Sequence, residues 1–158
     1  MRSSPTRRSW VAGLAGSDPP HEGGAAALVT GARQFLRWLP AAAQATLIFV
    51  LSAQPDLHLA DEPQLDFVLH KVGHLAVYAI LAAFVAWALD LPGRLRSRTW
   101  TLAVAACLAY AASDELHQAF VHGRHPTPVD VAIDVFGALL GLAAYAWLTR
   151  NRSSQTPV

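Results

Sequence analysis

Two stretches, residues 75–89 and 135–149, are apolar around the whole circumference of a helix and carry no charged side chain. A surface helix of a soluble bundle needs a polar stripe that faces water, and neither stretch has one. Because both are shorter than the roughly 18 residues usually required of a membrane span, a soluble helical bundle is the main alternative. In a chain of 158 residues, however, little protein is left to cover such helices. We therefore expect lipid to surround them.

The predicted fold class is all-α, an integral membrane four-helix bundle that crosses the cell membrane several times. Prolines separate the four predicted helices, which cover residues 34–53, 67–89, 99–121 and 129–149 of a domain that extends from 34 to 150. Residues 1–33 are rich in Gly, Pro, Ser and Arg without periodicity, which predicts a disordered tail. Residues 151–158 form a second predicted tail.

The distribution of arginine predicts the orientation of the bundle. Arginines collect in residues 1–37, in the connection 90–98 and after residue 149, whereas the connection 54–66 contains four acidic residues and no Lys or Arg. By the positive-inside rule, both termini are then cytoplasmic, and the first and third connections face outward. The net charge of only +1 gives no indication of a nucleic-acid partner.

Ionisable residues inside the predicted helices are the second constraint, because each costs about 2.5–3.5 kcal/mol in a membrane and such residues usually mark function. There are eight of them: His70, Lys71, His74, Asp114, Glu115, His117, Asp130 and Asp134. One residue on each of three helices lies 16 positions from the charged residue at the cytoplasmic end, namely His74, Asp114 and Asp134. At about 1.5 Å per residue, all three are predicted ~24 Å above the inner boundary, just beneath the outer surface.

Helical spacing also predicts which side chains share a face. One stripe on each of the last three helices repeats every three or four positions: Lys71, His74 and Tyr78; then Tyr110, Asp114 and Gln118; then Asp130 and Asp134. Gly137 and Gly141 continue the last stripe and predict close approach of a neighbouring helix. A purely structural role remains an alternative, with buried ion pairs such as Lys71 with Asp114 or Asp134 holding the helices together.

Several short motifs, in this order, resemble the VanZ-like membrane protein family over roughly residues 38–148. They are Ser52-Ala53-Gln54-Pro55, Lys71-x-x-His74-x-x-x-Tyr78, Asp114-Glu115-x-x-Gln118-x-Phe120, Gly123-Arg124 with Asp130, and Gly137 with Gly141. The resemblance implies a small multi-pass membrane protein. The name-giving members are associated with reduced susceptibility to teicoplanin-type antibiotics. The chain departs from the family pattern at Asp134, where Asn is frequent, and at His122, where Pro is frequent; the extra carboxylate implies either a metal ligand or a different ion pair.

The leading functional hypothesis is an enzyme that acts on lipid headgroups or on a lipid-linked cell-envelope intermediate at the outer leaflet. The predicted catalytic residues are His74 as base or nucleophile, Asp114 or Asp134 to orient its imidazole, and Glu115 as a second acid–base group. The predicted substrate-binding residues are Lys71, Tyr78, Gln118, Arg124 and Asp130, with the arginine suited to a phosphate.

Two other functions remain open. One is a non-catalytic protein that binds a lipid or glycopeptide and alters antibiotic susceptibility. The other is a small transporter, for which two copies of the four-helix chain could form the path as a homodimer. The sequence specifies no cofactor, and we predict no metal site, because Lys71 next to the His70/His74 pair opposes a cation. The open metal alternative is Glu115 with Asp114 and Asp130 around Mg²⁺ or Ca²⁺.

Overall fold

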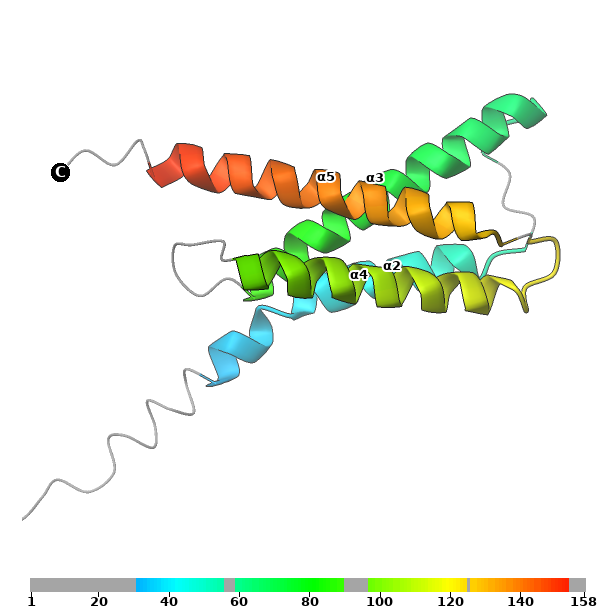
Figure 1. Cartoon of the computed structure of the whole chain (residues 1–158). Helices are drawn as coiled ribbons and strands as arrows, with labels where there is room; N and C mark the ends of the chain where they lie inside the picture. Colours follow the sequence, from blue (N-terminus) through cyan, green and yellow to red (C-terminus); the bar gives the residue numbers. More distant parts are fainter. Residues whose placement is uncertain (1–30, 56–58, 90–96, 125, 154–158) are drawn as a thin grey trace, which may run out of the picture. The chain divides into compact units, whose positions relative to one another are not determined.

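The computed structural model describes residues 31–55, 59–89, 97–124 and 126–153, and its regular secondary structure within these ranges is entirely helical. The labelled helices are α2 (Leu39–Ser52), α3 (Pro63–Leu89), α4 (Ser97–Gln118) and α5 (Pro128–Ser153) (Figure 1). The all-α prediction of four helices is confirmed. Most of the two predicted tails, residues 1–30 and 154–158, lies outside the described residues.

Helix boundaries differ from the predicted ones by up to five residues. Helix α3 begins at Pro63 rather than at residue 67, with Asp66 in its first turn. Proline in the first turn and an acidic residue near the helix N-terminus both favour this earlier start. The next helix, α4, ends at Gln118 rather than at residue 121, shortly before Gly123, whose φ is 79°.

Three helices are long and apolar enough to cross a membrane: Gly31–Ser52, Pro63–Leu89 and Pro128–Asn151. The predicted third span, α4, does not meet this criterion over the described residues, since it carries Asp114 and Glu115 as well as Arg98. Three polar side chains in its last turns nevertheless face the protein, while several leucines along the helix face outward. Asp114, Glu115 and Gln118 are buried, whereas Leu102, Leu108 and Leu116 are exposed. This reversal of the soluble pattern fits a helix surrounded by lipid.

Helices α2 and α4 run in one direction, and α3 and α5 run in the opposite direction. In Figure 1, α3 and α5 both begin at the end where α2 and α4 finish, and α3 contacts all three other helices, most extensively α5. Tyr110 of α4 donates a hydrogen bond to the Ala45 carbonyl of α2, and farther along both helices Ser52 contacts Asp114. The C-terminal ends of α2 and α4 therefore meet the N-terminal ends of α3 and α5.

Two glycines bring α5 against the backbone of α3. A Cβ atom on Gly137 would lie 2.9 Å from Leu75 Cα, and one on Gly141 would lie 2.7 Å from Ala79 Cα, both closer than real Cβ atoms approach such neighbours. The close approach predicted from the glycine spacing is thus present. Directly packed backbones fix the register between α3 and α5, and this register places the polar side chains described below.

Candidate functional site

Side chains of α3 and α5 form two polar pairs on successive turns. Lys71 of α3 pairs with Asp130 of α5, which also accepts a hydrogen bond from Thr127. One turn farther along, His74 Nδ1 lies 3.0 Å from Asp134 Oδ1. The helices run in parallel, so the residue numbers of both pairs rise together. The predicted pairing of Lys71 with Asp114 or Asp134 is wrong: Lys71 takes Asp130 as its partner, while Asp134 contacts His74.

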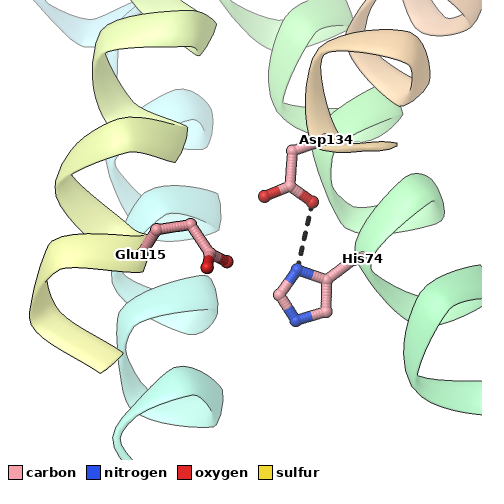
Figure 2. Close-up of side chains that lie close together, drawn as sticks. All are labelled: His74, Glu115 and Asp134. Carbon is pink, nitrogen blue, oxygen red and sulfur yellow. Dashed lines mark hydrogen bonds and ion pairs between the residues drawn. The ribbon is translucent and has the colours of Figure 1, made fainter. Parts of the chain in front are cut away.

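Glu115 of α4 faces the His74–Asp134 pair, so three helices contribute to one group (Figure 2). One ligand-type atom from each of these three residues lies within 4.8 Å of the other two. Asp134 is completely buried and Glu115 is 7% exposed. Both oxygens of Glu115 and Oδ2 of Asp134 lack a hydrogen-bond partner among the described residues.

The contact with Asp134 determines how His74 can act. A carboxylate oxygen accepts, so the hydrogen bond places the imidazole proton on Nδ1 and leaves Nε2 with a free lone pair. Such a histidine can take a proton from a substrate or a water molecule, with the resulting positive charge stabilised by the carboxylate. Of the two carboxylates that the sequence left open as partners of His74, Asp134 is the one that contacts it, whereas Asp114 contacts Ser52.

Asp114 belongs to a second polar group, between α2 and α4. Its Oδ2 atom accepts hydrogen bonds from Ser52 Oγ at 2.8 Å and from Gln118 Nε2 at 3.0 Å. Gln118 also donates to Ser52 Oγ at 3.2 Å. These buried bonds tie α2 to α4, and the contacts place Gln118, a predicted substrate ligand, within the protein interior.

Arg124 and Tyr78 occupy different surroundings from the three-residue group. Arg124 donates from Nε to the Gln54 carbonyl at 3.3 Å and from Nη2 to the Leu51 carbonyl at 3.2 Å, at the C-terminal end of α2. Tyr78 is completely buried, its hydroxyl lacks a partner among the described residues, and its ring centre lies 6.2 Å from that of Tyr110.

A pocket of about 140 Å³ lies beside His74 and gives access to it. Its walls come from α2, α3 and the segments next to them. The polar lining residues are Ser52, His70, His74 and Arg124, and the apolar ones include Ile48, Leu51, Leu59 and Val77. The pocket therefore combines nitrogen donors with a hydrocarbon wall, a combination suited to an amphiphilic ligand.

Comparison with known protein families identifies the chain. A family model described as VanZ/LLP1 matches residues 27–149, which include all the residues discussed above. The chain belongs to the VanZ/LLP1 family. Comparisons with curated proteins and with solved structures gave no match. With its apolar spanning helices, the VanZ/LLP1 chain is a membrane protein, and the predicted family assignment is confirmed.

Some residues of this VanZ/LLP1 site were absent from the predicted set. Ser52 contacts Asp114 and lines the pocket, although its motif was recognised only as part of the family pattern. Its position at the end of an apolar run was the available signal. His70 lines the pocket as well and forms a hydrogen bond of 2.9 Å with the Asp66 carbonyl. Its position one helical turn before His74 could have identified it as a residue of the pocket.

Proposed function

We propose that this VanZ/LLP1 protein is an enzyme of the cell membrane that acts on a lipid headgroup or a lipid-linked envelope intermediate at the outer leaflet. The observation that carries the proposal is the pocket in which His74 and Arg124 share a wall with Ile48, Leu51 and Val77. A lipid with an anionic headgroup matches both parts of this lining, because the acyl chain contacts the apolar wall and the headgroup faces the guanidinium of Arg124.

Arg124 supports the binding of an anionic group. Two of its nitrogens hold the end of α2, and Nη1 makes no hydrogen bond with the described residues. A guanidinium that is already immobilised can offer this remaining donor to a phosphate oxygen with little further loss of side-chain entropy.

His74 is the proposed general base. Its Nε2 atom takes the proton of an attacking hydroxyl or water, and Asp134 stabilises the imidazolium that forms. The bond to the leaving headgroup breaks, and protonated Glu115 supplies the proton that the leaving oxygen needs. Asp114 holds α2 and α4 together and so positions the pocket wall.

The test compares lipid turnover in vesicles that contain the full-length protein, labelled anionic and zwitterionic phospholipids, and a labelled polyprenyl diphosphate lipid. Wild type is expected to change at least one lipid, and His74→Ala to reduce that rate by at least about 100-fold, since general-base catalysis contributes about 10²–10⁴-fold. Ser113→Ala is the control, because this exposed hydroxyl only bonds the Tyr110 carbonyl of its own helix. If wild type changes none of these lipids but binds a lipid or a glycopeptide, the protein is a binding protein and the enzyme proposal is wrong.

The orientation can be tested separately by cysteine labelling. Gly123 is unsuitable because its positive φ strains any other residue, so exposed His122 is the better position. In a Cys107→Ala background, His122→Cys is expected to react with an impermeant maleimide from outside the cell. Asn151→Cys, exposed near the C-terminal end of α5, is expected to react only after permeabilisation. The reverse labelling pattern would place the pocket at the inner leaflet.

A further inference from the structure

Two buried carboxylates, those of Glu115 and Asp134, face each other and the His74 ring without a cationic side chain to neutralise them. Within the described parts of the chain, no Lys or Arg pairs with either group. Lys71 is engaged by Asp130, and Arg124 by backbone carbonyls. Two like charges at this separation in a low-dielectric interior are strongly unfavourable unless one carboxylate is protonated, as in the proposed reaction, or a positive charge lies between them.

The carboxylate oxygens of Glu115 and Asp134 that have no hydrogen-bond partner among the described residues indicate where a positive charge would bind. Glu115 is more than nine-tenths buried, and Figure 2 shows its carboxylate directed toward His74 and Asp134. Neither of its oxygens has a partner among the described residues, nor does Oδ2 of Asp134. Buried polar atoms are satisfied in the great majority of cases, so three oxygens without a partner on facing side chains indicate a ligand that accepts lone pairs.

We propose that His74, Glu115 and Asp134 bind one divalent transition-metal ion, with Zn²⁺ as the best fit and Mn²⁺ as the nearest alternative. One imidazole nitrogen and two carboxylate oxygens match the preferences of these ions, whereas Mg²⁺ prefers oxygen ligands alone. The ion and the two carboxylates together carry no net charge, which suits the membrane interior. Three protein ligands leave a fourth position for water or a substrate oxygen, as in catalytic zinc sites. The ion would bind the imidazole that is the proposed general base, so metal binding and general-base action by His74 are alternative states of the site.

The side chains need only a short movement to reach metal-binding distances. Tetrahedral ligands about 2.0–2.1 Å from Zn²⁺ lie roughly 3.4 Å apart, compared with the present limit of 4.8 Å. Glu115 has the longest side chain of the three, and no described hydrogen bond holds its carboxylate. Its rotation therefore closes most of the gap while the α3–α5 packing stays fixed.

The objection raised by Lys71 does not apply to this site. The lysine is paired with Asp130 one turn away, so it neutralises that carboxylate rather than opposing a cation beside His74.

The test measures metal binding to the full-length protein in detergent, after chelation and removal of any histidine tag. Wild type is expected to bind about one Zn²⁺ per chain and to gain thermal stability on binding. Glu115→Gln is expected to weaken the affinity at least ~10-fold, and Asp134→Asn likewise. Asp114→Asn is the matched control: it alters the neighbouring carboxylate, which faces Ser52, and is expected to change the affinity less than about threefold.

The outcomes separate the metal site from the proposed function. Binding of the metal does not depend on that function; only the use of the metal in a reaction rests on it. Folded wild type that binds neither Zn²⁺ nor Mn²⁺, or equal weakening by Glu115→Gln and Asp114→Asn, would overturn the metal site. Stoichiometric binding without lipid turnover would support the site and count against the enzyme. If Asp134→Asn fails to fold, Glu115→Gln still decides.

Discussion

Replacing Gly141 with alanine is expected to destabilise the protein by about 1–3 kcal/mol, the usual cost of overpacking a close contact. The added Cβ would meet the Ala79 backbone of α3, which cannot rotate away as a side chain does. Alanine is otherwise the better helix former, by about 0.8–1.0 kcal/mol in water. The expected change in stability is therefore opposite in sign to the change that helix propensity alone would cause.

Thermal unfolding in detergent measures this loss of stability. Gly73→Ala is the matched control, since nothing lies within 4 Å of the position where its Cβ would be. We expect this variant to be as stable as wild type or slightly more stable. If both variants behave alike, the close packing of α5 on α3 does not stabilise the protein.

Replacing Asp134 with asparagine is expected to lower lipid turnover by about 10²–10⁴-fold while the chain still folds, provided that the proposed function holds. The amide has nearly the shape of the carboxylate, so the packing around this completely buried residue is kept. It cannot stabilise an imidazolium electrostatically, and its NH₂ group can turn toward His74 and favour the wrong tautomer.

The measurement is the turnover rate at saturating substrate, together with the unfolding midpoint of the same preparation. A fall in rate at unchanged stability supports a role of Asp134 through His74. Asp134→Leu, which has no polar atom, should lose the rate to the same extent and show whether the amide itself interferes. A rate within threefold of wild type in both variants would exclude this role.

The sequence was sufficient to predict the helices because their apolar runs are long and interrupted by proline. It was less informative about their ends. The helix α5 continues to Ser153, four residues past the predicted end, because a helix needs no apolar residues once it leaves the membrane. Similarly, acidic Asp66 was placed in a connection, although it lies in the first turn of α3.

The partners within the site could not be predicted from spacing. A period of three or four residues shows that Lys71, His74 and Tyr78 share a face, but the rotation of each helix about its own axis decides what that face meets. Asp114 and Glu115 are adjacent in the chain, yet Asp114 turns toward Ser52 of α2 and Glu115 toward His74 and Asp134. That division results from packing between helices.

The reversed polarity of α4 also bears on how the chain enters the bilayer. Its outward Leu102, Leu108 and Leu116 favour transfer into lipid, while Asp114 and Glu115 oppose it by a few kcal/mol each until other helices shield them. Glu115 meets His74 of a helix synthesised earlier and Asp134 of one synthesised later. Stable integration of α4 is therefore complete only after the last span has been made.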